Sequence, residues 1–149
     1  YRDDVAANLA VAERWVTEHP DTEFDFFLPP YSILFWDKVI REGRTEAVFA
    51  AIRQAGQTLL QYDNVKFYGY LMDPEIVTNL DNYCDYIHHS GGVCREILAM
   101  LQREEGRLTE ENLEETLANW REFVVHYDYD QFWDERFWIQ WNAEHAAAP

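Results

Sequence analysis

The apolar residues of the chain follow helical spacing over several long stretches. Val5, Leu9, Ala12 and Val16 fall on one face of a helix that we predict from Arg2 to His19. The same spacing predicts further helices over residues 31–42, 45–62 and 93–103. A last helix is predicted to start at Thr109, an N-cap residue type followed by two glutamates.

Two short apolar runs predict β-strands instead. Residues 24–28 form one run before two prolines, and residues 65–70 form the other. Because helices separate the runs, they predict a parallel sheet with crossover connections, with the first strand in its interior. Such sheets carry their sites at the carboxyl ends of the strands. We therefore expect residues 29–32 and residues 79–90 to share one rim.

Composition limits the classes of function. The chain has 149 residues, 48% of them hydrophobic, which is enough for one globular domain with a core. A formal net charge of −16 argues against nucleic acid as a partner and disfavours an anionic membrane surface. No stretch has the length and hydropathy of a membrane span or signal peptide. The chain opens at Tyr1 without a methionine, so we expect it to be the later part of a longer product.

The segment between the second strand and the helix at residue 93 contains the candidate chemistry. Asp85 and His88 are three residues apart, a spacing that lets a carboxylate accept a hydrogen bond from imidazole Nδ1. That bond leaves Nε2 free to act as a base. The alternative is a loop carboxylate bonded to a structural histidine. Ser90 and Ser32 have the residue type of helix caps, which we favour over nucleophiles at both positions.

Two cysteines flank this pair. Cys84 and Cys94 form either a disulfide or, as we favour, two buried unpaired thiols. Together with Asp85, His88 and His89 they have the residue types of a zinc site. No CxxC or HExxH spacing accompanies them, so we predict no metal and no cofactor. His89 is expected to face solvent.

Aromatic residues are concentrated in the last part of the chain. Trp133, Phe137 and Trp141 recur every four residues, as on a helix face. Such a face is either a sugar-binding platform or, as we favour, a docking surface against the rest of the fold or against a missing half. We divide the chain into an α/β domain at 1–107 and a helical, aromatic-rich C-terminal extension at 108–149.

Two strings resemble segments of a known family. Phe26-Phe27-Leu28-Pro29-Pro30-Tyr31-Ser32-Ile33-Leu34-Phe35-Trp36 and Asn79-Leu80-Asp81-Asn82-Tyr83-Cys84-Asp85-Tyr86-Ile87-His88-His89-Ser90 are similar to runs of bacterial SGNH-hydrolase-like proteins. That family is related to the D-alanine transfer protein of teichoic-acid synthesis. The resemblance extends over residues 5–124. It implies a flavodoxin-like three-layer α/β/α fold, here an incomplete half.

The resemblance also implies a function. A serine esterase or acyltransferase of this type acts on acyl esters of cell-envelope glycans or teichoic polymers, with Asp85 as the orienting acid and His88 as the base. The Gly-x-Ser nucleophile block and the oxyanion-hole residues do not occur in this chain, so we expect a missing N-terminal half or a partner chain to supply them. The implied location is the extracytoplasmic face of the cell envelope, with an upstream anchor.

A second hypothesis comes from a different class of protein. In that interpretation the chain is a non-catalytic interaction or binding module, which folds or forms a homo-oligomer by itself. Its aromatic tail and acidic surface would then serve recognition.

Overall fold

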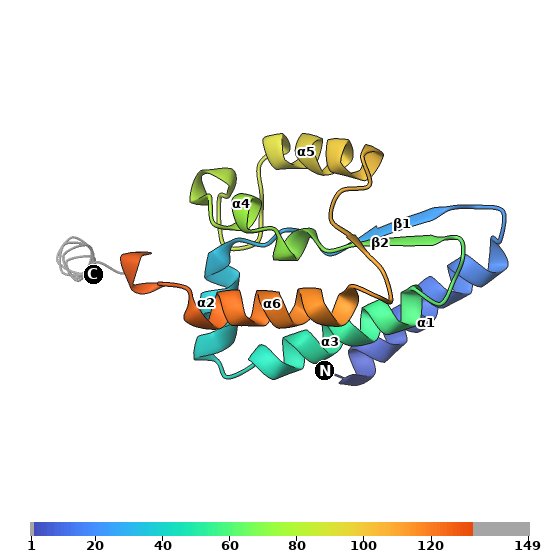
Figure 1. Cartoon of the computed structure of the whole chain (residues 1–149), viewed down its shortest axis with the longest axis horizontal. Helices are drawn as coiled ribbons and strands as arrows, with labels where there is room; N and C mark the ends of the chain where they lie inside the picture. The colour runs from blue at the N-terminus through green and yellow to red at the C-terminus, as the bar shows by residue number, and fades with distance from the viewer. Residues whose placement is uncertain (1, 133–149) are drawn as a thin grey trace, which may run out of the picture.

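The computed structural model describes residues 2–132, and Figure 1 shows the arrangement of their helices and strands. In chain order the elements are α1 (Arg2–Glu18), β1 (Phe24–Phe27), α2 (Ile33–Arg41), α3 (Thr45–Leu59), β2 (Val65–Tyr68), η1 (Tyr70–Met72), α4 (Pro74–Val77), η2 (Leu80–Asn82), α5 (Gly91–Gln102), β3 (Arg107–Leu108), α6 (Leu113–His126) and η3 (Asp130–Phe132). The helices and both strands predicted before residue 109 are therefore present, with ends that shift by a few residues.

The strands form one small mixed sheet in the order β1-β2-β3. β1 and β2 are parallel, with Phe24 paired with Val65 and Phe27 with Tyr68. This confirms the predicted parallel pair with a helical crossover. β3 lies antiparallel to β2 and was not predicted, because two residues carry no periodic pattern. The prediction that the first strand is interior is wrong, since β1 is at the edge of the sheet that residues 2–132 form.

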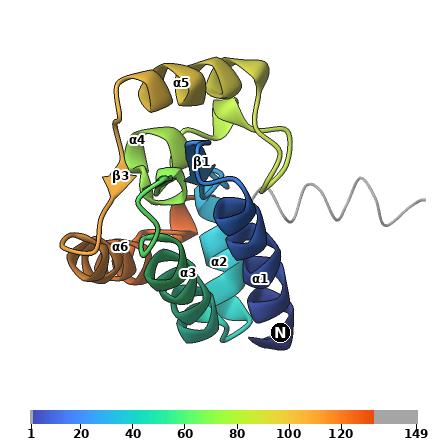
Figure 2. The same cartoon turned by 90° about the vertical axis from the view of Figure 1, so that its right-hand side faces the viewer.

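Helices cover both faces of this sheet. Seen along the strands in Figure 2, α1, α2, α3 and α6 lie on one side and α5 on the other. The predicted α/β class is thus confirmed. α6 packs on α3 and α2, so its residues belong to the same core as the parallel strands.

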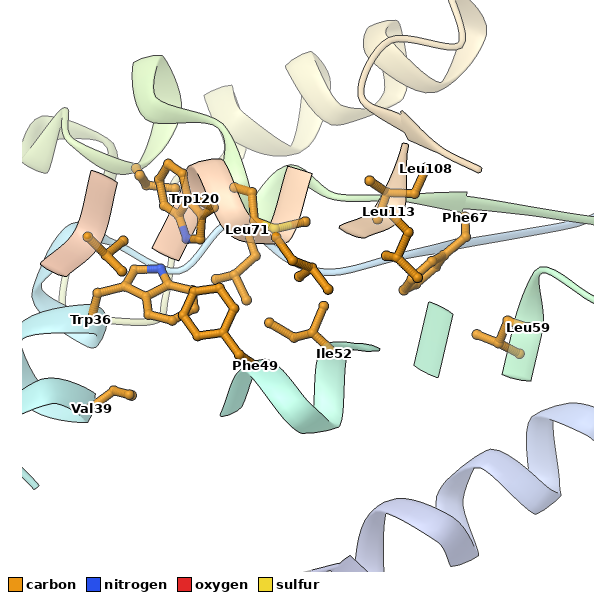
Figure 3. Packing of buried hydrophobic residues seen from close by; sticks show 14 of the residues in the cluster. Trp36, Val39, Phe49, Ile52, Leu59, Phe67, Leu71, Leu108, Leu113 and Trp120 are labelled. Carbon is orange, nitrogen blue, oxygen red and sulfur yellow. The ribbon is translucent and has the colours of Figure 1, made fainter. Parts of the chain in front are cut away.

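The larger core lies between the sheet and the four helices on its lower side. Its centre is aromatic: the ring of Trp36 is 5.2 Å from Phe49 and 6.0 Å from Trp120, centroid to centroid (Figure 3). α3 and α6 meet at Gly56, where an added Cβ would lie 2.7 Å from Leu113 Cδ2. A smaller cluster of Tyr68, Tyr70, Ile76, Val93, Ile97 and Met100 packs α5 onto the other face.

The start of α6 differs from the sequence prediction. We predicted Thr109 as its N-cap, but the helix begins at Leu113 with Asn112 in the N-cap position. Thr109 N donates to Asn112 Oδ1 at 2.8 Å, and Asn112 N donates to Thr109 Oγ1 at 3.2 Å. These reciprocal bonds close a turn over residues 109–112. The Thr109 hydroxyl and the Asn112 amide N–H are used within that turn, so the helix starts after it. The predicted aromatic repeat at Trp133, Phe137 and Trp141 lies outside the described residues.

Within residues 2–132 no helix combines the length and the hydropathy that crossing a membrane requires. The division of the chain at residues 107 and 108 stays a prediction.

The core predicts a clear contrast between two leucines. Leu117→Ala, at a side chain 1% exposed on α6, should lower the free energy of unfolding by about 2–5 kcal/mol because it leaves a cavity. Leu98→Ala, at a side chain 61% exposed on α5, should change it by less than about 0.5 kcal/mol. Urea unfolding of both variants measures the contrast. Equal losses would contradict the packing described here.

Candidate functional site

The segment after β2 folds into a short hairpin-like loop, residues 83–89. Tyr83 and His89 form an antiparallel bridge, and Cys84 N donates to the His88 carbonyl at 3.0 Å. Ser90 then caps α5, since its Oγ accepts from Val93 N at 3.4 Å. The prediction of Ser90 as a helix cap is therefore confirmed.

This loop is attached to the end of β1. Ser32 N and Ser32 Oγ both donate to the Tyr86 carbonyl, at 3.0 and 2.9 Å. Tyr83 Oη donates to the Pro30 carbonyl at 2.8 Å, and burial of Tyr83 raises the pKa of its hydroxyl. The segment after β1 and the segment after β2 thus share one rim, as the sequence predicted.

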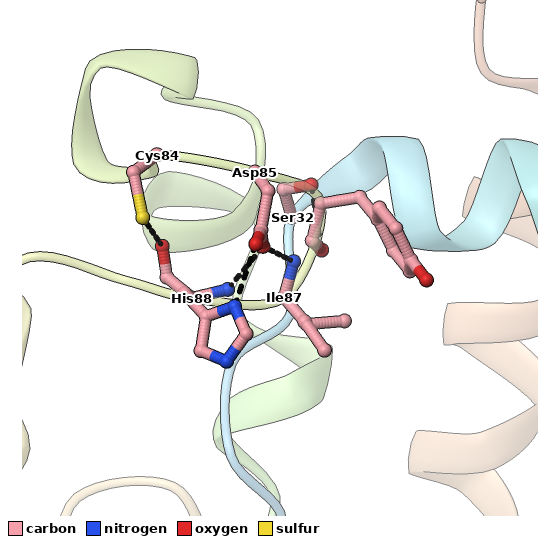
Figure 4. Close-up of polar contacts among 6 residues, drawn as sticks. Ser32, Cys84, Asp85, Ile87 and His88 are labelled. Carbon is pink, nitrogen blue, oxygen red and sulfur yellow. Dashed lines mark hydrogen bonds and ion pairs between the residues drawn. The ribbon is translucent and has the colours of Figure 1, made fainter.

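Asp85 and His88 are in direct contact on the loop (Figure 4). His88 Nδ1 lies 2.6 Å from Asp85 Oδ2. The other carboxylate oxygen, Oδ1, accepts from Ile87 N at 2.8 Å and from His88 N at 2.7 Å. A carboxylate that receives two backbone bonds at this spacing closes a tight turn, so it fixes the loop as well as the imidazole ring.

The environment of Asp85 favours its charged form. The hydrogen bond from the His88 side chain, followed by the backbone bonds from His88 and Ile87, lowers the pKa of Asp85 to about 2. Both side chains are open to solvent, with exposed fractions of 69% for His88 and 44% for Asp85. The ring nitrogen of His88 that does not contact Asp85 points away from it in Figure 4. The bond between His88 Nδ1 and Asp85 fixes the orientation of the imidazole ring and favours the tautomer with the proton on Nδ1.

Other candidates from the sequence lie elsewhere. Ser32 is fully buried at the start of α2, and its hydroxyl is bonded to Tyr86 rather than to the helix. Cys84 and Cys94 are unpaired, which matches the favoured alternative, but both are exposed where we predicted buried thiols. Cys94 Sγ lies 3.6 Å from His89 Nδ1. Among residues 2–132 no three such side chains gather in a way that could hold a metal ion.

A groove beside the loop is the feature that the sequence did not indicate. It has a volume of about 990 Å³ and is lined by residues of α2, the 80–86 segment and η3: Leu34, Asp37, Lys38, Arg41, Glu42, Leu80, Tyr83, Cys84, Asp85, Tyr86 and Asp130. Asp37 is 5% exposed, an unusual degree of burial for a carboxylate. No local sequence pattern distinguishes Asp37 from a solvent-exposed helix residue, so the sequence did not predict its burial or its place in the groove.

Charged groups of both signs face this groove. Arg41 Nε donates to Asp37 Oδ1 at 2.7 Å, and Lys38 Nζ lies 3.4 Å from Glu42 Oε1. Lys38 Nζ also lies 5.4 Å from the ring centroid of Tyr86, within the range of a cation–π contact. Burial raises the pKa of Tyr129, and the charge of Asp37 acts in the same direction. The groove therefore combines aromatic surface with a paired, largely buried carboxylate.

Comparison with known proteins gives a weak but specific likeness. No family model matches the chain, and no solved structure matches it. Two curated relatives are UPF0735 ACT domain-containing proteins from Lacticaseibacillus casei (strain BL23) and Lacticaseibacillus paracasei (strain ATCC 334). Each is 24% identical over 90 residues, which is 60% of this chain. The match spans about 62% of the length of these relatives.

These comparisons correct the resemblance drawn from the two strings. The prediction of an SGNH-hydrolase-like protein is wrong, because the curated proteins similar to this chain are named for an ACT domain. The predicted function, a serine esterase or acyltransferase of acylated glycans or teichoic polymers, is therefore wrong as well. The first string is rich in aromatic residues and the second in asparagine and aspartate, and shared composition can imitate shared ancestry.

The contact between Asp85 and His88 predicts a measurable change in acidity. In His88→Ala the largest cause of the low pKa is removed, so the pKa of Asp85 should rise from about 2 toward its ordinary value. It should stay below that value, because the backbone donors remain. A carboxyl ¹³C titration by NMR measures it, with His126→Ala as the control. A depressed folded pKa also means that this contact stabilises the fold above the ordinary aspartate pKa, and that the contribution is lost as the pH falls toward 2.

The attachment of the loop to β1 gives a second prediction. Ser32→Ala removes one of the two bonds to the Tyr86 carbonyl and should cost about 1 kcal/mol of stability. The amide of residue 32 should then exchange with solvent roughly fivefold faster, since about 1.4 kcal/mol corresponds to a factor of ten. Ser90→Ala, which alters the cap of α5 but not this attachment, should leave the exchange of that amide unchanged.

Proposed function

We propose that the chain is a small-molecule-binding module whose ligand lies in the groove between α2 and the 80–86 segment. The observation that carries this proposal is the groove itself. Its volume of about 990 Å³ lies at the upper end of the range of about 300–1,000 Å³ typical of ligand sites. Leucine and tyrosine side chains supply apolar surface, and a few charged groups converge on it, which is the usual make-up of such sites.

The charges in the groove favour one kind of ligand. Four carboxylates line it against two cationic side chains, Lys38 and Arg41. Asp85 is ionised at neutral pH, with a pKa of about 2. The position of Lys38 over the Tyr86 ring indicates that this ring can stack against a cation. A small molecule with an ammonium group and an apolar body fits these features, and an amino acid is the simplest example.

The relatives support the same class of function. Both carry the ACT domain in their names, and the domain of that name is a small-molecule-binding regulatory domain. At 24% identity, transfer of that role to this chain is part of the proposal. It agrees with the alternative of a non-catalytic binding module that the sequence left open.

Several sequence predictions stay predictions. They are a catalytic role for Asp85 and His88, a missing N-terminal half or partner chain, a homo-oligomer, and a cell-envelope location. The absence of nucleic acid among the partners is supported by the net charge of −16. The flavodoxin-like three-layer α/β/α fold, here an incomplete half, also stays a prediction, and helices on both faces of the sheet support a layered arrangement.

The experiment is a titration with matched ligands and variants. We expect L-phenylalanine and phenethylamine, which carry an ammonium group on an apolar body, to bind, and phenylpropionate, which lacks it, to bind more weakly. Isothermal titration calorimetry measures the affinities. Tyr86→Ala should weaken binding about tenfold, or about 1.4 kcal/mol, whereas Tyr86→Phe keeps the ring and should not.

A control variant separates the groove from the general surface. Phe27→Ala removes another aromatic ring with the same exposed fraction, 41%, at a position outside the groove, and should leave the affinity unchanged. If no member of the panel binds, or if Tyr86→Ala binds as the unaltered chain does, the proposed function is wrong.

A further inference from the structure

Among residues 2–132, no strand pairs with the main chain on the outer edge of β1. Phe24 N donates to the Asn64 carbonyl and Leu28 N to the Tyr68 carbonyl, both at 2.9 Å. In a parallel ladder alternate residues bond to the same neighbour, so the N–H and C=O of Asp25 and Phe27 point to the other side. No strand formed by residues 2–132 lies there, because β1 is at the edge of the sheet. Such an edge is a template for another strand.

β1 also carries an aromatic side chain that its present neighbours leave partly uncovered. Phe24 and Phe26 pack on the lower core, and the ring of Phe27 lies 5.9 Å from that of Tyr70 on the upper face. Apolar residues occur on both faces of β1, although Asp25 shares the upper face with Phe27. Here Phe27 remains 41% exposed. A further strand beside β1 would cover it.

α1 provides a surface below the space beside β1. Seen along the strands in Figure 2, α1 lies below β1 and on its outer side, opposite to the side of β2 and β3. Tyr62, which follows α3, donates its hydroxyl to Glu13 Oε1 at 3.0 Å. The flank of α1 that carries Glu13 therefore faces the end of α3. Trp15 and Val11 are each two residues from Glu13, about 200° around the helix, and therefore project on the opposite flank. They are 49% and 41% exposed.

We infer that the outer edge of β1 binds an extended segment of another polypeptide, which joins the sheet as a strand. Its residues facing α1 are apolar and cover Trp15 and Val11. Its residues on the other face carry Lys or Arg, because Asp25 lies on that face of β1 and the formal net charge of the chain is −16. Glu23, on the same face, is already paired with Lys66 of β2, whose Nζ lies 3.0 Å from Glu23 Oε1. Main-chain bonds to Asp25 and Phe27 supply affinity, and the alternating side chains supply selectivity.

A second copy of this chain fits the edge less well. Two copies, each with a formal charge of −16, repel one another. A basic strand is attracted to the acidic chain instead. A continuous sheet across two copies would also bring a second α1 into the space beside β1 that the first already flanks.

The test uses the exchange of individual amides and a defined peptide. The probe is a short acetylated and amidated peptide of alternating valine and lysine, added to ¹⁵N-labelled protein. We expect hydrogen exchange at the Asp25 and Phe27 amides to slow at least tenfold. The Phe24 and Phe26 amides, which the ladder already directs to β2, should not change. A peptide of alternating valine and glutamate should protect neither pair.

Two α1 variants test the surface beneath the strand. Trp15→Glu should abolish the protection by the valine–lysine peptide. Ala10→Glu, which adds the same charge at an exposed position on another side of α1, should leave it intact. Val11→Glu serves in place of Trp15→Glu if that variant fails to fold, as judged by circular dichroism.

Each remaining outcome overturns the inference. Absence of peptide protection at Asp25 and Phe27 excludes strand addition by a basic segment, and equal protection by the glutamate peptide excludes the charge preference. Protection that grows with protein concentration and without peptide identifies a second copy as the occupant. Since the edge and the groove have no residue in common, binding of L-phenylalanine in the groove is measured independently.

Discussion

The carbonyl of Tyr86 receives two hydrogen bonds from Ser32, and the geometry of the site depends on them. Ser32 is buried at the start of α2, so these bonds attach the 83–89 loop to the segment between β1 and α2. α2 supplies one wall of the groove and the loop supplies the other. The bond from Tyr83 Oη to the Pro30 carbonyl and the contact of Lys38 with the Tyr86 ring join the same two walls.

The two candidate sites are built by different kinds of interaction. Asp85 and His88 meet through a turn of four residues, 85–88, and the carboxylate itself closes that turn. The groove instead needs Asp37 and Tyr86, which are far apart in the sequence and come together only when α2 packs beside the loop. A local contact of this kind can persist in a loop that has lost its surroundings, whereas the groove exists only in the folded chain.

This distinction explains what could be predicted from the sequence. Apolar periodicity located α1, α2, α3 and α5 because each must bury one face. It also located β1 and β2, but apolar residues on both faces say nothing about lateral neighbours, so β1 was wrongly placed inside the sheet. The pair Asp85 and His88 was visible as a spacing. Asp37 was not, since its burial comes from packing that no neighbouring residue reveals.

The contact of Gly56 with Leu113 limits how this chain can change over time. An added Cβ at position 56 would lie 2.7 Å from Leu113 Cδ2, so even alanine requires the leucine or one of the two helices to move. A smaller residue at 113 would make room for a larger one at 56. In diverging homologues the two positions should therefore covary in volume.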